Sequence, residues 1–163
     1  MLVRKLLFHL RTILTVFWYR VLYGSRLHLG KHLSVRKDFN LMIASKGTVS
    51  IGRNCFFNSH CTIDVEVSVS IGDDCLFAEN VKIYDNNHRF SKEETPIREQ
   101  GSNSAPIVIG RNCWLASNVV VLKGSTIGDN CVIGANCIID GEIPPGSIVR
   151  LTTPQKIYPI DYH

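Results

Sequence analysis

His88, in the segment DNNH at 85–88, is the residue of this 163-residue chain whose position best suits acid–base chemistry. A neutral imidazole can take a proton from a hydroxyl group near pH 7, which is general-base catalysis. His88 comes directly before RFSKEETPIREQGSNSAP, a polar stretch with two prolines, and long loops in a compact fold are usually functional. The alternative is an ordinary surface histidine. We give that interpretation to the other five: His9, His28, His32, His60 and His163.

Cysteine is a second residue type that could do chemistry, as an acyl carrier or a metal ligand. All six cysteines fall at the same position of a repeated pattern that begins as IGRNC at 51–55. No pair has the CxxC spacing of a zinc site, and cysteine is a small, readily buried hydrophobe. We therefore expect Cys55, Cys61, Cys75, Cys113, Cys131 and Cys137 to pack in an interior, with no metal and no disulfide. Reduced thiols predict a cytoplasmic location.

The elements that position these residues follow from a period of six. Large apolar residues recur at every sixth position, for example at Ile51, Phe57 and Ile63. This period is the signature of a hexapeptide β-helix, an all-β parallel solenoid in which three short strands make one triangular coil of about 18 residues. We expect about five coils: a weak one at 33–50 and clear ones at 51–68, 71–88, 109–126 and 127–144. The period fails between 83 and 109, which predicts an extruded loop at about 89–106 with His88 at a coil corner.

Polar letters of the repeat mark the corners between strands. Glycine follows the apolar residue in all five IGxxC motifs, and asparagine or aspartate stands two positions later. Corners often need a positive φ, which glycine adopts freely and asparagine or aspartate adopts best among the other residues. We expect both positions to be turn residues.

Charge divides the chain into a basic arm and a mildly acidic body. Residues 1–37 hold eight Lys and Arg and no acidic residue, whereas the whole chain has a net charge of +4, so the rest carries −4. This distribution gives little support to nucleic-acid binding. We expect an N-terminal helix or arm at 1–30, a β-helix at 31–150 and a tail at 151–163.

Residues 1–23 have the pattern of a basic amphipathic helix with aromatic residues. The apolar stretch is shorter than the roughly 20 residues of a transmembrane helix. Two uses stay open. The helix could lie on the anionic inner leaflet of a membrane, or its apolar face could cap the first coil or pack in an oligomer. Its basic residues could also attract an anionic glycan.

Together these features resemble the hexapeptide-repeat acyltransferases, in the branch of the maltose/galactoside, xenobiotic and polysaccharide O-acetyltransferases. The resemblance rests on the hexapeptides, on DNNHRF before the loop and on IGRNCWLASNVVVLKGSTIGDNCVIGANCII after it. It implies a left-handed β-helix, acetyl-CoA as acyl donor, and a homotrimer with acetyl-CoA bound between subunits. It also implies that His88 is the catalytic base.

The same resemblance suggests further site residues. It makes Asn58 a partner for the acceptor hydroxyl or the reacting oxygen, although Asn58 could instead be another turn residue. It places Asp64, Glu66 and Asn87 near the acceptor. It places Trp114 beside acetyl-CoA and small residues along the pantetheine arm, where plain coil packing is the alternative: Ala116, Ser117, Ser125 and Ala135. Lys156, with Arg150, could pair with the CoA phosphates.

These inferences predict an acetyl-CoA-dependent O-acetyltransferase that acts on a sugar hydroxyl of a cell-surface polysaccharide or its precursor. His88 would remove the hydroxyl proton, and the oxygen would attack the thioester. The alternative is a non-catalytic β-helix scaffold or binding module. A γ-carbonic anhydrase on the same fold needs three histidines, and no second histidine lies near His88 in the sequence.

Overall fold

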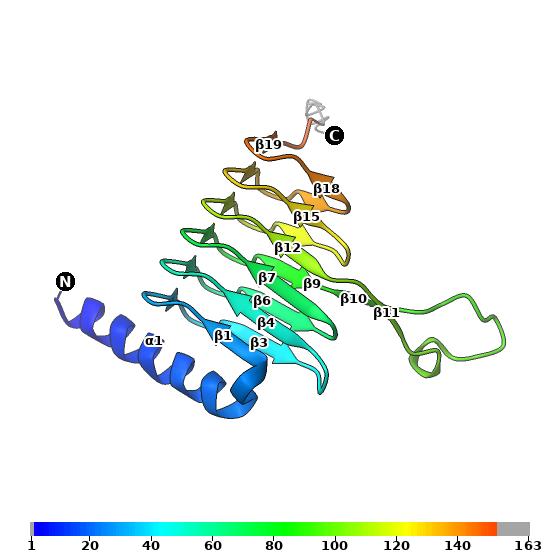
Figure 1. Ribbon diagram of the computed structural model, residues 1–163, viewed down its shortest axis with the longest axis horizontal. Helices are drawn as coiled ribbons and strands as arrows, with labels where there is room; N and C mark the ends of the chain where they lie inside the picture. The colour runs from blue at the N-terminus through cyan, green and yellow to red at the C-terminus, as the bar shows by residue number, and fades with distance from the viewer. Residues whose placement is uncertain (1, 153–163) are drawn as a thin grey trace, which may run out of the picture.

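Short parallel strands and sharp corners wind the chain into a left-handed triangular β-helix of about six coils, preceded by one helix (Figure 1). This computed structural model describes residues 2–152, with side chains described from residue 7 onward. The fold class predicted from the period of six is confirmed, with about one coil more than the period indicated. The strands outside the predicted coils are β1, before residue 33, and β19, after residue 144.

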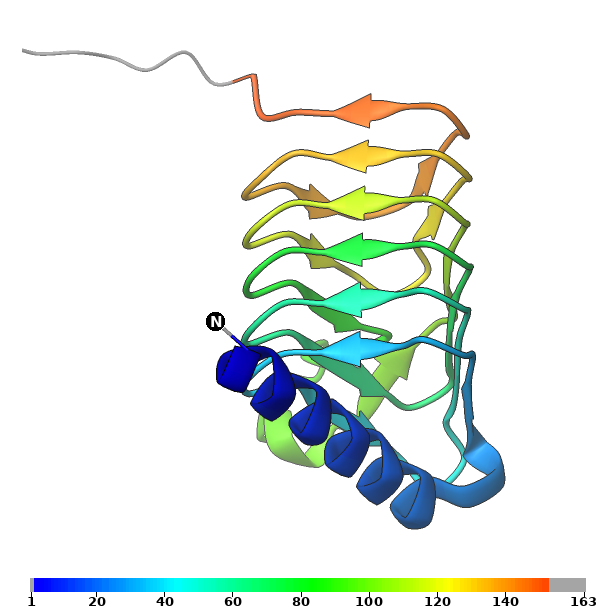
Figure 2. The ribbon, with the colours of Figure 1, turned by 90° about the vertical axis from the view of Figure 1, so that its left-hand side faces the viewer.

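Each side of the triangle is one parallel sheet, and the sheets are named A, B and C here. Sheet A contains, in spatial order, β1 (Leu27–Leu29), β4 (Thr48–Ile51), β7 (Ser68–Ile71), β12 (Ile107–Ile109), β15 (Thr126–Ile127) and β18 (Glu142–Ile143). Sheet B contains β2 (Ser34–Val35), β5 (Phe56–Phe57), β8 (Leu76–Phe77), β13 (Trp114–Leu115), β16 (Val132–Ile133) and β19 (Ile148–Val149). Sheet C contains β3 (Asn40–Ile43), β6 (Thr62–Val65), β9 (Lys82–Tyr84), β14 (Val120–Val121) and β17 (Ile138–Ile139). Figure 2 shows successive strands of the stack lying directly above one another.

Residues of like kind stack in the interior because the coils are in register. Ile51 pairs with Ile71, and Phe57 pairs with Phe77, whose rings stack with centroids 4.2 Å apart. Both phenylalanines are fully buried. The sixfold apolar positions therefore form one continuous core along the axis, as the period predicted.

All six cysteines are buried and free, as expected. Their thiols link neighbouring coils: Cys55 Sγ donates to the carbonyl oxygen of Gly72 at 3.2 Å, and Cys75 Sγ donates to that of Gly110 at 3.1 Å. A small side chain with a weak donor thus fills the narrow interior and satisfies a buried carbonyl at each step.

The expected corner residues divide into two physical classes. Positive φ is found at seven of the eight predicted Asn and Asp positions, namely Asn54, Asp74, Asn80, Asn112, Asn118, Asn130 and Asn136. The eighth, Asn86, lies in a strand. The glycines of the motif do not have positive φ, so that part of the prediction is wrong. A Cβ on Gly72 would lie 2.6 Å from the backbone nitrogen of Arg111 in the next coil, so glycine is needed for close stacking.

Helix α1 (Leu2–Tyr23) and a 3-10 turn, η1 (Gly24–Arg26), cover the exposed edge of the first coil. Thr12 Oγ1 donates to the backbone carbonyl of Val35 at 3.1 Å. The Tyr19 hydroxyl donates to the carbonyl of Phe39 at 3.1 Å, and the Tyr23 hydroxyl donates to the carbonyl of Leu41 at 2.8 Å. These bonds satisfy backbone groups that have no strand beyond them. The helix therefore caps the β-helix, but through its polar and tyrosine side. The proposed cap by the apolar face is wrong, because that face points to solvent.

In the described part of the chain, no helix combines the length and the apolar character that crossing a membrane requires.

Native thiols should be unreactive toward a disulfide reagent such as DTNB, and all six should react after unfolding in guanidinium chloride. The reason is that burial shields every sulfur from the reagent, including Cys113, whose pKa the neighbouring Cys75 lowers to about 7; at Cys61 burial also raises the pKa to about 11. Absorbance at 412 nm counts the thiols. One thiol that reacts rapidly and stoichiometrically in the folded protein would contradict the structure and reopen a cysteine acyl carrier.

Candidate functional site

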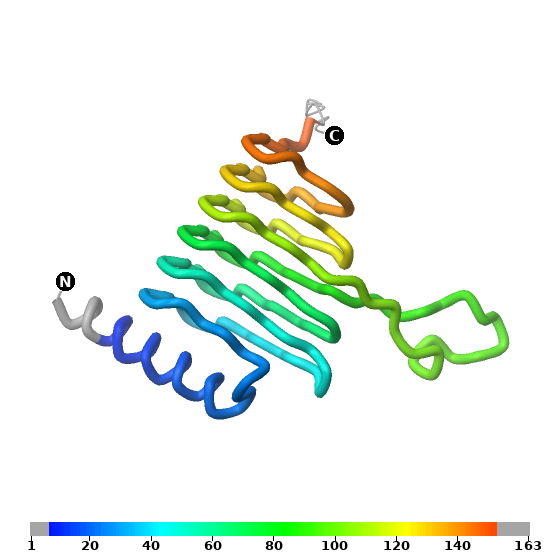
Figure 3. Tube along the Cα trace, in the orientation of Figure 1, coloured from blue at the N-terminus to red at the C-terminus, as the bar shows by residue number. Residues whose placement is uncertain are grey.

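The break in the period is a two-stranded ribbon that projects from the stack between β9 and β12 (Figures 1 and 3). We call residues 86–104 the arm. Its antiparallel strands are β10 (Asn86–His88) and β11 (Ser102–Ser104), and a short 3-10 turn, η2 (Ile97–Glu99), lies between them. His88 pairs with Ser102 on the arm, so it lies beyond the coil corner at which the sequence placed it. The reason is that ribbon pairing begins directly after Asp85.

Asp85 anchors the arm to the stack. Its carboxylate is fully buried and accepts hydrogen bonds from the backbone N–H groups of Glu66 and Val67, both at 2.7 Å. Its carbonyl oxygen accepts from the N–H of Ala105, where the chain returns from the arm, at 2.9 Å. A buried carboxylate is tolerated when donors surround it, and here it ties the coil below to both ends of the arm.

Glu66 connects this corner to the His88 ribbon. Its Oε2 accepts hydrogen bonds from the hydroxyl of Ser102, at 2.6 Å, and from that of Ser104. These two bonds lower the pKa of Glu66, and the charge of His88 lowers it further. Glu66 is therefore an ionised carboxylate at neutral pH, close enough to His88 for an electrostatic interaction.

Asp64 lies on β6 beside the same corner. Burial raises the pKa of its carboxyl, and the charges of Asp85 and Glu66 raise it further. Three acidic side chains thus lie close together, yet within the described residues no group of His, Cys, Asp and Glu could hold a metal ion.

A hollow of about 370 Å³ lies along the arm and includes His88. Its lining residues are Asn87, His88, Arg89, Phe90, Ser91, Asn103 and Lys123. His88 is exposed, so its ring is accessible to a hydroxyl bound there. Lys123, which sequence reasoning missed, comes from the corner after β14, one coil above β9. Only the coil register could have identified Lys123, because it places the turn after β14 above the point where the arm leaves the stack.

The predicted cofactor residues gather at a different corner, between sheets B and C. Asn58 Nδ2 donates to Glu79 Oε1, and Ser117 Oγ donates to Glu79 Oε2 at 3.2 Å. Asn58 does not have the positive φ of a turn residue. Ala116 and Ala135 lie at the same corner of successive coils and are partly or fully exposed. Trp114, on β13, is 50% exposed and is flanked across sheet B by Leu76 and Val132.

One chain therefore does not bring all the predicted residues together. His88, Asn87, Glu66 and Asp64 lie near the corner between sheets C and A, whereas Asn58 and the Trp114 group lie near the corner between sheets B and C. Ser125 is fully buried, and its hydroxyl donates to the carbonyl of Ile139 at 3.1 Å, so it does not line the surface around Trp114. Arg150 is exposed, and Lys156 lies outside the described residues.

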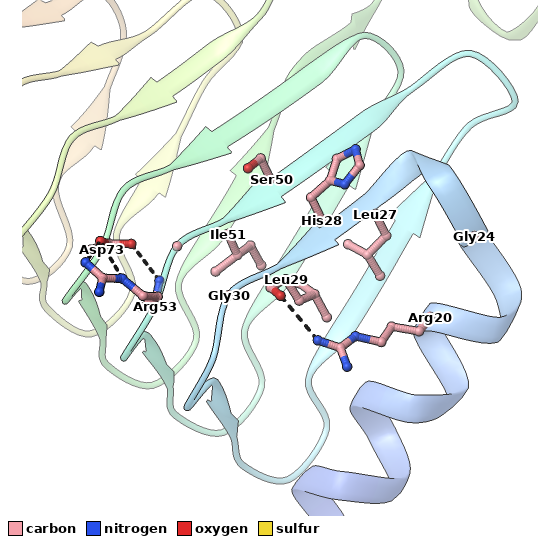
Figure 4. Close-up of a pocket in the computed structure, with 11 residues that line it drawn as sticks. Arg20, Gly24, Leu27, His28, Leu29, Gly30, Ser50, Ile51, Arg53 and Asp73 are labelled. Carbon is pink, nitrogen blue, oxygen red and sulfur yellow. Dashed lines mark hydrogen bonds and ion pairs between the residues drawn. The ribbon is translucent and has the colours of Figure 1, made fainter.

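A larger hollow lies elsewhere. It measures about 680 Å³ and lies between α1 and sheet A (Figure 4). Its charged groups are already engaged: Arg20 donates to the carbonyl of Leu29 at 3.2 Å, and Arg53 pairs with Asp73 at 2.6 Å. His28 is its only histidine among the lining residues. His28 lies beside Ser50 across β1 and β4 in this groove, but Asp73, the only carboxylate among its lining residues, is paired with Arg53, so His88 near Glu66 is the stronger candidate for a base.

Comparisons with known proteins agree with this fold. A family model described as bacterial transferase hexapeptide (six repeats) matches residues 106–141, and one described as hexapeptide repeat of succinyl-transferase matches residues 48–84. The galactoside O-acetyltransferase of Escherichia coli K12 is 43% identical over 110 residues, which cover 67% of this chain and 52% of that protein. The putative lipopolysaccharide biosynthesis O-acetyl transferase WbbJ of the same strain is 31% identical over 138 residues, which cover 80% of this chain and 70% of that protein.

A solved structure of a galactoside acetyltransferase in complex with coenzyme A has a TM-score of 0.67 and 35% identity, and the match covers 79% of this chain and 63% of that one. The chain spans about half the length of several curated relatives that it matches.

Replacing Glu66 by alanine should loosen the arm, because Ser102 and Ser104 lose their common acceptor. We expect faster hydrogen exchange in peptides from 86–104, with the β-helix unchanged. Glu94→Ala, at an exposed glutamate of the same arm, is the matched control. Since the pKa of Glu66 is lowered in the folded protein, its contribution is present above the ordinary pKa of a glutamate and is lost as the pH falls through the folded value. The wild-type arm should therefore loosen in acid. Equal exchange in Glu66→Ala and wild type would contradict this role.

Proposed function

Because the chain belongs to the family of hexapeptide-repeat acetyltransferases, we propose that it transfers an acetyl group from acetyl-CoA to a sugar hydroxyl, with His88 as the general base. The observation that carries the proposal is the position of His88: exposed in a hollow, on a ribbon held by Asp85 and Glu66. A non-catalytic scaffold has no use for an ionised carboxylate beside an accessible imidazole.

The proposed chemistry uses few groups. Bound acetyl-CoA supplies an acyl group already activated as a thioester. His88 takes the proton of the acceptor hydroxyl as the oxygen attacks the acyl carbon, and the thiolate of CoA leaves. The charge of Glu66 stabilises the imidazolium that forms. Its bonds from Ser102 and Ser104 tie β11 to the coil below, and because His88 pairs with Ser102 they help to fix the direction of the imidazole.

The outer face of sheet B suits the apolar arm of acetyl-CoA. Leu76, Trp114 and Ile148 form an exposed apolar strip along successive strands, and Ala116 and Ala135 leave space at the adjoining corner. Ser117 Oγ and the backbone groups of that corner provide polar partners. In this proposal Trp114, Ala116, Ser117 and Ala135 bind the cofactor. Lys156, which the structure does not describe, and Arg150 contribute to the CoA phosphates.

A homotrimer would complete the site. Within one chain the cofactor strip and Asn58 lie at one corner, and His88 lies at another. We infer that the arm of one subunit meets the sheet B–C corner of its neighbour, so that acetyl-CoA lies between His88 of one chain and Asn58 of the next. The separation of the two groups in a single chain supports this arrangement.

The proposed acceptor is a sugar of a cell-surface polysaccharide or its precursor. Relatives are named for galactosides and for lipopolysaccharide biosynthesis. Asn87 and Asn103 provide uncharged hydrogen-bonding groups in the hollow, and Asp64 and Glu66 add carboxylates at its base, a combination that suits sugar hydroxyls. Six free, buried cysteines favour the cytoplasm as the place of reaction.

Replacing His88 by alanine should lower kcat by roughly 10²- to 10⁴-fold and leave the fold intact, because the ring is exposed and serves only proton transfer. Release of CoA thiol with acetyl-CoA and a series of galactosides and nucleotide sugars measures the rate. His28→Ala, at an exposed histidine of β1, is the matched control and should be fully active. Most of the activity surviving in His88→Ala would exclude His88 as the base.

A further inference from the structure

Helix α1 turns one side to the β-helix and leaves the opposite side without a partner. Thr12, Val16, Tyr19 and Tyr23 face the first coil, where they bond to backbone carbonyls or pack on the core. Positions spaced three and four residues apart share a helix face, so these residues define the inner side.

The outer side of α1 is mostly apolar, with Arg11 as its charged residue. Its large apolar side chains are each more than half exposed: Leu7 60%, Leu10 51%, Ile13 64%, Leu14 59%, Phe17 64%, Trp18 62%, Val21 62% and Leu22 51%. Leu7, Leu10, Leu14, Phe17 and Val21 follow one another at steps of three and four and form a continuous stripe. We call these eight residues the outer face. Globular proteins rarely leave so large a contiguous apolar patch in water, and such patches mark contact surfaces.

Positive charge borders the outer face, and acidic residues are absent from its element. Arg11 and Arg20 lie on α1, and both are exposed. Lys31, Arg36 and Lys37 add charge on the first coil, at the same end of the stack, where Asp38 is the first acidic residue of the chain. A second α1 laid against this face would bring arginines against arginines with no carboxylate on either helix, which disfavours self-association.

An anionic lipid surface fits both properties of the helix. Apolar side chains can enter the boundary between headgroups and acyl chains while arginine and lysine contact the headgroups. Trp18, on the outer face, has the amphipathic ring that is enriched at this boundary. We propose that the outer face of α1 docks the protein on the surface of an anionic bilayer.

The position of α1 leaves the rest of the protein free for chemistry. The helix lies across the first coil, at one end of the stack, and the arm leaves the stack two coils further on (Figures 1 and 2). The inner side of α1 is held by hydrogen bonds to Val35, Phe39 and Leu41, so docking needs no release of the helix from the body. The surface is therefore preformed, and lipid binding does not depend on acetyl transfer.

The test is flotation of the purified full chain with vesicles of phosphatidylcholine alone or mixed with phosphatidylglycerol. We expect wild type to float with the anionic vesicles, to bind neutral vesicles less, and to lose binding as salt is raised. Leu14→Glu/Phe17→Glu should lower the partition coefficient by about tenfold or more, because two apolar anchors are lost and two negative charges face the lipid. Ile138→Glu/Ile148→Glu, at two exposed positions on other elements, is the matched control and should bind like wild type.

Circular dichroism and the thermal midpoint should be unchanged in the Leu14→Glu/Phe17→Glu variant, since both side chains are more than half exposed. Failure of wild type to bind anionic vesicles would overturn the proposal. So would a change of the oligomeric state, measured by light scattering, in the Leu14→Glu/Phe17→Glu variant alone, because the outer face would then be covered by a second copy of the chain. Either result would leave the proposed acetyl transfer unaffected.

Discussion

The structure depends on one constraint, the close stacking of successive coils in register. Strands of neighbouring coils must hydrogen-bond along all three sheets, which leaves no room for a Cβ where the corner after sheet A passes over the next coil. Gly52, Gly72 and Gly110 meet this constraint, each with a backbone nitrogen of the next coil 2.6 Å from the place a Cβ would occupy. The buried cysteines belong to the same motif as these glycines, and each thiol donates a hydrogen bond to a carbonyl of the next coil. The same contacts repeat from coil to coil, and so does the sequence motif.

Register also decides where function can be placed. Side chains inside the stack are committed to packing, so reactive groups must lie at corners, on outer faces or on insertions. The arm is an insertion that respects the register on both sides, because β7 pairs directly with β12 although the arm separates them in sequence. Asp85 makes this possible by satisfying the backbone groups of Glu66 and Val67 in the coil below the one that the arm interrupts. His88 is thereby exposed on the arm, while Asp85 holds the end of the arm that joins the stack.

The sequence predicted those features that the register repeats and missed those that occur once. The period of six identified the solenoid, the buried cysteines and most corners. It gave only a weak signal for the first coil, whose corners use His32 and Asp38 in positive φ instead of asparagine. It placed His88 at a corner, since pairing of Asn86–His88 with Ser102–Ser104 leaves no periodic signal.

Two other features that the sequence did not predict also occur only once in the chain. The amphipathic pattern of the N-terminal segment identified a helix, but not which side faces the body. The side that faces the body is set by the hydroxyls of Tyr19 and Tyr23, which donate hydrogen bonds to carbonyls at the edge of the first coil. The role of Glu66 as the acceptor for Ser102 and Ser104 depends on the arm folding back over the corner. Asn58 and His88 lie at different corners of one chain, and the proposed arrangement brings them together only between neighbouring subunits.

The central claim is that this chain binds acetyl-CoA on the Trp114 strip and uses His88 only for chemistry. Calorimetric titration of acetyl-CoA into wild type, His88→Ala and Trp114→Ala tests it without knowledge of the acceptor. The account predicts saturable binding of equal affinity in wild type and His88→Ala, and weaker binding in Trp114→Ala. No binding to the folded wild type would contradict the transferase, and loss of binding in His88→Ala would show that His88 holds the cofactor and is not the base.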